Sequence, residues 1–484
     1  MLELQHSRLG SWVLRDQWPL GLLIAFATGA AVYVGGVRLL AVITAVFWLA
    51  TAAYYWPLVI AGLALLQSGD FFRFVPPNAF LWIQLAPGQG LNLLDVLVLV
   101  SLPFAVLRLA QRHERPVFAW PVLLLMGAAA LSVAIGLVAG GATLSAATPF
   151  SRTIFYYVMY FVIVAAIDTR RKLDAWITLV LGIMAVAVAI QLVEAVTGHR
   201  LSSGLVDFGY AGRLSVGGQY GVVYVWNRAA TLSLLGLMLA LGVLVESRPV
   251  RLRFIWLAGL GLVGFAFAFV RQWFIYVIVG VLGVLLAQRT SRGRGVLVTA
   301  LIVGLAVLFL VAGSPLVTAS FGPSFVDAWL ARASTLVSWG DQATNISRIH
   351  DMGVQWHSFL QSPLVGHGQS ATSLTGTASY DVGITSFLVE TGVLGLLAAA
   401  FLWASFLANA FKVRRDIGEG TWRGYAIGLI GFWMAVLAGS LYGVNYFSAK
   451  DGVWVVVVAL ALVDRLQALH APATDMAYVQ PHVR

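Results

Sequence analysis

Residues 254–287 read FIWLAGLGLVGFAFAFVRQWFIYVIVGVLGVLLA, two apolar runs separated by Arg271 and Gln272. Each run is close to the length with which an α-helix crosses a hydrocarbon core of about 30 Å. A charge inside a bilayer is expensive, so Arg271 is expected at or below a membrane interface, where the chain turns back. This stretch therefore predicts two membrane helices joined by a very tight connection.

Apolar runs of this kind recur along the chain. Of its 484 residues, 60% are hydrophobic and only 10% are charged, whereas soluble domains carry about 25% charged residues. This composition excludes a soluble enzyme and a disordered chain, and the absence of cysteine excludes a disulfide scaffold. The strict alternation of an outer-membrane barrel is also missing. We expect an all-α polytopic integral membrane protein with about 12–14 transmembrane helices. The predicted spans are 18–35, 38–54, 57–72, 92–108, 117–139, 153–167, 173–196, 228–246, 254–270, 273–288, 296–313, 384–410, 424–441 and 450–467.

The basic residues predict the orientation, because cytoplasmic loops of membrane proteins are enriched in lysine and arginine. With both termini in the cytoplasm, 20 of the 30 basic residues fall on that side. Merging the short spans 38–54 and 57–72 would instead move the N-terminus outside. The favoured division has a cytoplasmic N-terminus at 1–17, a helix bundle at 18–313 with an outer loop at 197–227, a large outer loop at 314–383, C-terminal membrane helices at 384–467 and a cytoplasmic tail at 468–484.

Two arginines on the outer side are candidate ligands for an anion. Arg271 is expected to face a partner or a polar cavity, and the alternative is an arginine that reaches up to the outer headgroups. Arg213 lies in GYAGRLSVGGQYG, residues 209–221. The glycines of this stretch let backbone N–H groups approach an anion closely. The alternative for Arg213 is a solvated side chain in a flexible loop.

The large outer loop is expected to contain an amphipathic helix that Asn345 or Ser347 caps and that Pro363 ends. Arg348 lies at the beginning of this helix, as a further candidate ligand or as an ion-pair partner of Asp351 three residues later. One face of the helix forms an apolar stripe, which consists of Ile349, Met352, Trp356 and Phe359.

Three histidines raise the question of a metal site in the same loop. His350 and His357 are expected on the water-facing side of the amphipathic helix, and His367 follows in SPLVGHG. Neither an HExxH pattern nor a carboxylate-rich frame accompanies them. We therefore expect no metal and no cofactor.

The segment SYDVGITSFLVETGVLGLL, residues 379–397, places two carboxylates where the loop re-enters the membrane. Asp381 is expected at the interface, where a carboxylate could act as a general base. Its alternative role is that of a helix N-cap. Glu390 is expected about two helical turns deeper, in a structural role as the partner of an arginine inside the bundle.

Several motifs occur in a fixed order along the chain: NLLDVLVLV (92–100), GRLSVGGQYGVVYVWNRAA (212–230), Arg271 beside a short span, SRIHDMGVQW (347–356) with SPLVGHG (362–368), and YDVGITSFLVETGVLGLL (380–397). In order, spacing and the single large outer loop, the chain resembles the bacterial O-antigen ligase and O-antigen/exopolysaccharide polymerase family. The resemblance covers roughly residues 20–465.

The resemblance implies a membrane fold like that of the C-type glycosyltransferases and an inverting, metal-independent transfer of glycan from undecaprenyl diphosphate. It implies that Arg213 and Arg271 hold the donor diphosphate, although the surroundings of Arg271 read VRQW and not the SRG-like motif. Arg348 matches the arginine that opens the helix before the PLxGxG turn. Asp381, beside Tyr380, stands where the ligases have a catalytic histidine, and polymerases often lack that histidine. His350 and His367 are the reserve candidates for the base.

Three functions remain open at this point. The first is a polymerase that joins lipid-linked repeat units into an O-antigen or exopolysaccharide at the periplasmic face of the bacterial inner membrane, with a flippase and a chain-length regulator as partners. The second is a ligase that transfers finished glycan to a lipid or protein. The third is a transporter of the same lipid carrier, which should show inverted repeats and broken helices, and the sequence indicates neither. We expect no nucleic-acid partner.

Overall fold

The structure is a computed structural model that describes residues 83–86, 89–91, 93–139, 156–197, 211–214, 222–225, 230–247, 251–268, 271–288, 295, 343–368, 383–442 and 450–470. The predicted spans 18–35, 38–54, 57–72 and 296–313 lie outside these residues. The described part is mostly helical, as the sequence predicts. Its helices are α4 (Leu93–Gln111), α5 (Ala119–Val138), the short 3-10 helix η1 (Tyr156–Val158), α7 (Met159–Ala166), α8 (Arg170–Thr197), α9 (Ala230–Glu246), α10 (Leu252–Ala268), α11 (Arg271–Ala287), α15 (Ala343–Gln361), α17 (Gly383–Asp416), α18 (Thr421–Tyr442) and α19 (Lys450–His470).

Two short hairpins add strands that the all-α prediction lacks. β1 (Ile83–Ala86) pairs antiparallel with β2 (Gln89–Leu91). β3 (Ala211–Leu214) pairs antiparallel with β4 (Val222–Val225), inside the predicted outer loop 197–227. The apolar pattern VVYV of β4 is too short to tell a strand from a helix end by periodicity.

Four of the described helices are long and apolar enough to cross a membrane. They are Ala119–Val138, Gly383–Asp416, Thr421–Leu441 and Gly452–His470, and each contains an 18-residue window with a mean hydropathy of at least 1.2. A helix of about 20 apolar residues spans a hydrocarbon core. The described part is therefore that of a mostly helical membrane protein. Further described helices overlap the predicted ranges 92–108, 153–167, 173–196, 228–246, 254–270 and 273–288.

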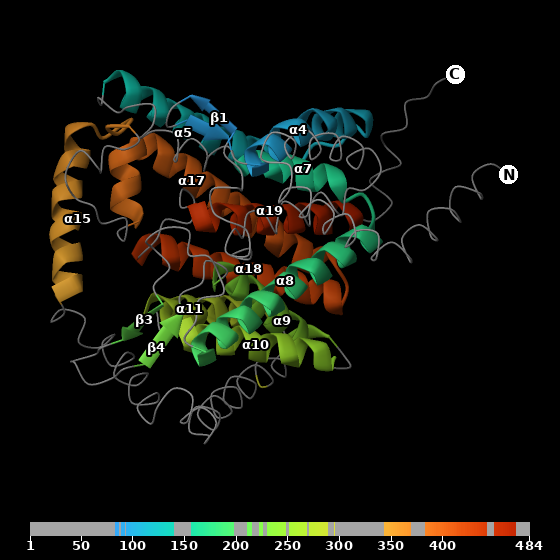
Figure 1. Cartoon of the computed structure of the whole chain (residues 1–484). Coiled ribbons are helices and arrows are strands. Elements are labelled where there is room, and N and C mark those ends of the chain that lie inside the picture. The colour runs from blue at the N-terminus through green and yellow to red at the C-terminus, as the bar shows by residue number, and fades with distance from the viewer. Residues whose placement is uncertain are drawn as a thin grey trace, which may run out of the picture.

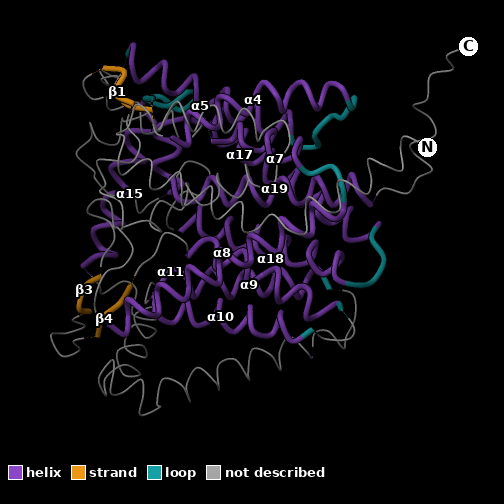
Figure 2. Tube along the Cα trace, turned by 45° about the vertical axis from the view of Figure 1, so that its right-hand side comes forward, coloured by secondary structure: helices purple, strands orange, loops and turns teal. Residues whose placement is uncertain are grey.

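Most described helices run side by side, and α15 lies across one end of them (Figure 1). In the centre, α18 packs against α9 and α11 on one side and against α17 on the other. α10 covers α9, while α5 packs on α17 and α4 on α7. Figure 2 shows the same arrangement after a turn of 45°, with α15 and the two hairpins still at one end of the bundle.

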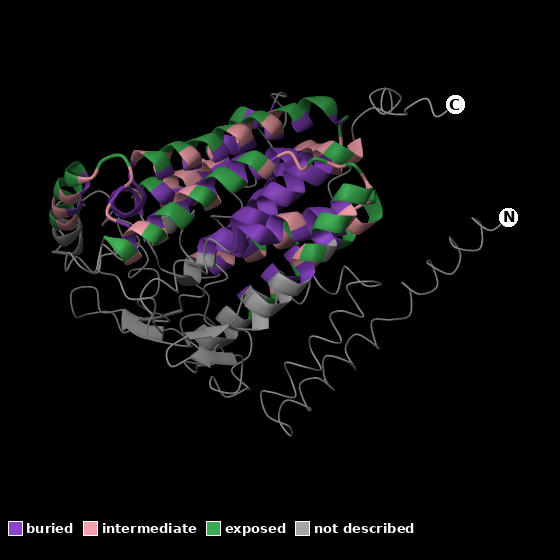
Figure 3. Ribbon diagram, turned by 90° about the horizontal axis from the view of Figure 1, so that it is seen from above, coloured by how far each residue is buried: buried purple, intermediate pink, exposed green. Residues whose placement is uncertain are grey.

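The buried residues gather along the inner helices, and exposed residues cover the outward faces of the outer ones (Figure 3). α19 contributes an uninterrupted buried run from Val453 to Leu466, and α9 is buried over almost its whole length. By contrast, Trp120 on α5 and Trp256 on α10 are 75% and 67% exposed. Large apolar side chains on outward faces are expected where lipid replaces water.

A seam of glycines lets α9 and α18 approach each other backbone to backbone. A Cβ atom on Gly242 of α9 would lie 2.2 Å from the carbonyl oxygen of Gly424, and one on Gly428 of α18 would lie 2.4 Å from the carbonyl oxygen of Met238. Small residues drive helix association in membranes, because apolar side chains gain little there by leaving the lipid. This glycine seam fixes the distance between the two central helices.

The two ends of the bundle differ in charge. We call the end where α8, α10 and α18 begin the basic end, and the opposite end, with α15 and the hairpin of β3 and β4, the loop end (Figure 1). Among the described basic residues, Arg213, Arg271, Arg348 and Lys450 belong to elements or helix starts at the loop end. The basic end holds all the others, namely Arg108, Arg112, Arg115, Arg170, Arg171, Lys172, Arg251, Arg253, Lys412, Arg414, Arg415, Arg423 and Arg465.

A buried network ties α19 to α5 and α7 at the basic end. Asp464 is fully buried, and its Oδ2 accepts hydrogen bonds from Tyr160 Oη at 2.5 Å and from the backbone N–H of Val117 at 2.6 Å. Arg465 donates from Nη2 to Asp464 Oδ1 at 2.6 Å and from Nη1 to Glu114 Oε2 at 2.8 Å. Because both charges are paired and hydrogen-bonded, their burial is tolerated.

Candidate functional site at the loop end

The helix α17 is broken near the loop end. Gly392 has φ 64° and ψ −166°, so the residues before and after it form two separate helical segments. This backbone conformation is open to glycine and strained for other residues. The sequence indicates no broken helix, and this expectation is wrong. The break could not be foreseen, because the Thr391–Gly392 step lies inside an apolar run and carries no proline or charge that would mark it.

A turn that follows α15 satisfies the backbone groups that the break leaves unpaired. The N–H groups of His367 and Gly368 donate to the carbonyl oxygens of Val389 at 2.7 Å and Glu390 at 3.1 Å. In the other direction, the N–H groups of Val393 and Leu394 donate to Pro363 and Leu364. We call the turn 362–368 together with residues 389–394 the interlock. Irregular backbone at membrane depth requires such partners, because lipid offers none.

Helix α5 closes the interlock from the side. Ser132 Oγ donates to the carbonyl oxygen of Glu390 at 2.7 Å, so this oxygen accepts two hydrogen bonds. A Cβ on Gly368 would lie 2.2 Å from the backbone nitrogen of Gly136, one turn further along α5. The turn, α17 and α5 therefore contact one another through backbone atoms and small residues. These close contacts fix the positions of the side chains at the interlock.

Polar side chains line the first segment of α17, where the chain re-enters the bundle. The side chain of Glu390 is buried, at 4% exposure, inside the interlock. Thr385 Oγ1 donates to Oε1 of Gln355, a fully buried residue of α15, at 2.5 Å. Gln355 Nε2 and Ser386 Oγ are also buried and have no hydrogen-bond partner among the described residues. Buried polar atoms without a partner are costly and are typical of places that bind a polar ligand or water.

The imidazole of His367 is held in one orientation. Its Nε2 lies 2.7 Å from the carbonyl oxygen of Ser358 on α15. A carbonyl only accepts, so Nε2 carries the proton, and Nδ1 is the nitrogen that can take up another one. Of the two reserve bases, His367 is thus fixed at the interlock, whereas His350 is an exposed residue of α15.

α15 differs in detail from its prediction. It ends at Gln361, before Pro363, as expected, but it begins at Ala343, so Asn345 and Ser347 lie within its first turns and do not cap it. His350 and His357 are exposed, and the expectation that they face water stays a prediction. The apolar stripe is split, because Phe359 packs with Leu388 and Val389 of α17, whereas Ile349 and Trp356 remain 48% and 49% exposed.

The three candidate arginines belong to elements that share the loop end. Arg213 lies in β3 opposite Val223 of β4, and β4 contacts α8 and α10. Arg271 is the first residue of α11, and α10 ends at Ala268, so the division into two helices with a tight connection follows the prediction. Arg348 lies in the first half of α15, whose other end joins the interlock, and Figure 1 shows α15 extending from α17 toward β3 and β4. α15 therefore connects the neighbourhood of the arginines with the interlock.

Two predicted residues lie outside the described part of the chain, namely Tyr380 and Asp381. α17 begins at Gly383, two residues after Asp381. Sequence reasoning missed Ser132, Gln355 and Ser386, whose polar side chains stand alone in otherwise unremarkable apolar or amphipathic stretches. The signal that could have indicated close packing of α5 is the serine among small residues of a membrane helix.

Within the described residues, no group of three or more His, Asp or Glu side chains could hold a metal ion. No protein-family model matches the chain, and the comparison with curated proteins finds no match.

Proposed function

We propose that the protein is a membrane glycosyltransferase that polymerises lipid-linked oligosaccharide repeat units into an O-antigen or exopolysaccharide. The observation that carries the proposal is the interlock, which joins the amphipathic helix α15 to a broken α17 and buries polar groups between them. These are the segments SRIHDMGVQW, SPLVGHG and YDVGITSFLVETGVLGLL, on which the family resemblance rests. The interlock is proposed to lie near the outer membrane interface, where a lipid-linked sugar presents its diphosphate.

The chemistry requires a held diphosphate and a proton acceptor. Undecaprenyl diphosphate is a good leaving group, and arginines stabilise the charge that develops on it. Arg213 and Arg271 are proposed to hold this diphosphate, with Arg348 nearby on α15. A base removes the proton from the acceptor hydroxyl, which attacks the anomeric carbon and inverts it. Asp381 is proposed as that base, with Tyr380 beside it and His367 as the reserve.

The charge difference between the two ends supports the orientation. The basic end holds most of the described basic residues, so it is proposed to face the cytoplasm, and the loop end the periplasm. We further propose that the protein crosses the bacterial inner membrane about 12–14 times. The chain lacks cysteine, so a single cysteine at Ser334, in the predicted loop 314–383, can be labelled from outside. Labelling that needs membrane lysis would contradict this orientation.

A ligase uses the same donor and the same leaving group, so it remains the second enzymatic candidate. The broken helix α17 supports a third candidate, because transporters build substrate sites from discontinuous helices. A transporter would need a second broken helix in the corresponding half. Among the described residues, a break of this kind occurs in α17 alone.

A strain that lacks the protein separates the three candidates. Loss of a polymerase leaves single repeat units that are attached to cell-surface acceptors or remain on the carrier lipid. Loss of a ligase leaves long glycan that is attached to the carrier only. Loss of a transporter leaves repeat units on the cytoplasmic face, where a membrane-impermeant sugar oxidant does not reach them. We expect the first result, and restoration of polymer by the wild-type chain.

A further inference from the structure

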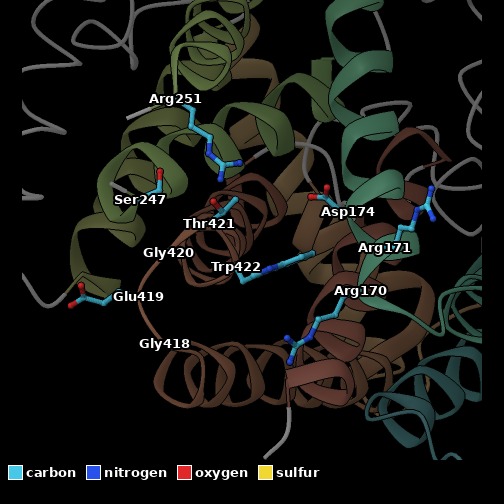
Figure 4. A pocket seen from close by; sticks show the side chains of 10 residues that line it. All are labelled: Arg170, Arg171, Asp174, Ser247, Arg251, Gly418, Glu419, Gly420, Thr421 and Trp422. Carbon is cyan, nitrogen blue, oxygen red and sulfur yellow. The ribbon is translucent and has the colours of Figure 1, made fainter. Parts of the chain in front are cut away.

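A cavity of about 560 Å³ opens at the basic end, far from the interlock. It lies where α8, α10 and α18 begin and where α9 ends, and its wall includes Arg170, Arg251, Ser247, Thr421 and Trp422. Figure 4 shows Arg251 extending toward Thr421 and Trp422, with Arg170 on the other side of Trp422. The volume is within the range of pockets that hold a small ligand or a headgroup.

The wall of this cavity favours an anion. Arg170, Arg171 and Arg251 contribute three positive charges. The first N–H groups of α18, from Thr421 onward, have no partner within their own helix and carry a partial positive charge. Arg170 Nε donates to the carbonyl oxygen of Leu469 at 3.0 Å, which holds the side chain while its two terminal nitrogens remain for a ligand.

A buried hydroxyl on the same wall is left without a protein partner. Ser247 is 6% exposed, and its Oγ has no hydrogen-bond partner among the described residues. A buried polar atom of this kind carries a cost that a bound ligand removes. The carboxylates of Asp174 and Glu419 also belong to the wall, and they would accept hydrogen bonds from hydroxyl groups of the ligand.

The surface next to Arg251 is apolar and turned outward. Leu252, Ile255 and Trp256 follow Arg251 on one face of α10 and are 65%, 49% and 67% exposed. On a helix at the membrane boundary, such a face contacts acyl chains, and tryptophan is typical of the headgroup level. A soluble anion would not contact this apolar face. A lipid would contact the arginines with its phosphate and the apolar face with its acyl chains.

We propose that the basic-end cavity binds an anionic phospholipid, with its phosphodiester between Arg170, Arg251 and the start of α18, its headgroup hydroxyls near Asp174 and Glu419, and its acyl chains along Leu252, Ile255 and Trp256. Basic pockets between membrane helices on the cytoplasmic side recognise anionic headgroups in this way. The site is separate from the loop end and does not depend on the proposed glycosyl transfer.

Retention of labelled phosphatidylglycerol tests this proposal. The full-length protein is reconstituted in phosphatidylcholine vesicles that contain roughly 10% labelled phosphatidylglycerol. The protein is then extracted in mild detergent, and the amount of label bound per protein is measured. The variant Arg170→Gln/Arg251→Gln should bind phosphatidylglycerol about tenfold more weakly or worse, because it removes two positive charges that the headgroup phosphate contacts. The control Lys412→Gln/Arg415→Gln removes two exposed charges at the same end but outside the cavity, and it should retain the wild-type amount.

Three outcomes would overturn the proposal. Equal loss in the cavity variant and the control would mean that diffuse surface charge, and no site, attracts the lipid. Complete displacement of the label by millimolar inorganic phosphate would mean that the cavity takes a soluble phosphate. Because Arg170 also holds Leu469, the variant Ser247→Ala/Arg251→Gln repeats the test with that contact intact, and wild-type retention by this folded variant would likewise reject the site.

Discussion

The backbone N–H of His367 donates to the carbonyl oxygen of Val389 at 2.7 Å, just before the break in α17 at Gly392. The two residues are separated by a segment that includes the predicted base, yet they are fixed to each other by backbone atoms. We therefore expect a displacement of α15 to shift the first segment of α17 and its polar groups with it.

The first prediction concerns the break itself. In Gly392→Ala, the new Cβ would lie 2.4 Å from the carbonyl oxygen of Leu364, at a φ of 64°. With ψ at −166°, this backbone region is essentially restricted to glycine, and a residue with a side chain is strained there by roughly 1–3 kcal/mol. We expect polymer formation to fall about tenfold or more, measured as glycan per cell at equal protein level. Gly353→Ala on α15 is the matched control, because its Cβ would meet no atom within 4 Å. Normal polymer in Gly392→Ala would mean that the interlock plays no part in function.

The second prediction concerns the donor diphosphate. Arg213→Ala and Arg271→Ala are each expected to abolish polymer, and the lysine variants should restore little of it, because an ammonium does not reproduce bidentate contacts to phosphate oxygens. Arg415→Ala, an exposed residue of the basic end, serves as the control. Full activity of Arg271→Lys would show that charge alone suffices, and full activity of Arg271→Ala would make the residue a membrane anchor.

The third prediction separates two roles of Asp381. Loss of a general base costs about 10²–10⁴-fold in turnover, so Asp381→Asn should lower turnover of purified protein far more than it lowers affinity for the donor. As a helix cap, asparagine is about as good as aspartate. A nearly silent Asp381→Asn would therefore remove Asp381 from the mechanism. His367→Gln would then be the decisive variant, since glutamine can still donate a hydrogen bond but cannot act as a base.

The fourth prediction is that catalysis needs no metal. Purified protein should keep its activity after treatment with EDTA, because the residues that could bind a metal lack a ligand frame in the sequence. Inactivation by the chelator, reversed by a divalent ion, would contradict this. It would direct attention to His350, His357 and Asp351 on α15.

The fifth prediction concerns stability at the basic end. Asp464→Ala leaves the buried Arg465 without its main partner and Tyr160 without its acceptor. Breaking a buried ion pair from one side costs about 3–5 kcal/mol. We expect a clear loss of thermal stability in detergent, followed by tryptophan fluorescence. Asp416→Asn, which is exposed at the same end, should stay within about 0.5 kcal/mol of wild type.

Much of the fold could be predicted from the sequence, because membrane helices are decided locally. The division into two helices at Arg271 and the exposed position of His350 on α15 follow from apolar runs and helical period alone. The break at Gly392 could not be found in this way. Its cause lies in a turn about 25 residues earlier, whose backbone groups replace those of the helix.

The candidate site was predicted less completely for a related reason. The pattern of α15 predicts one apolar stripe, but the structure buries Gln355 and Phe359 and leaves Trp356 half exposed. The sequence of α15 alone does not show which part of its amphipathic face is buried, because the burial depends on the packing of α17 against it. In the same way, Ser132 gains its role only because the carbonyl oxygen of Glu390 lies within reach.

The glycine seam between α9 and α18 also limits how substitutions can change the basic-end cavity. Ser247 follows α9, and Thr421 and Trp422 begin α18, so two of its walls are spaced by backbone atoms at Gly242 and Gly424. Repacking of side chains elsewhere does not change that spacing. The main chain therefore fixes the width of the cavity between these two helices. Single substitutions of the charged residues that line the cavity can still change which ligand it binds.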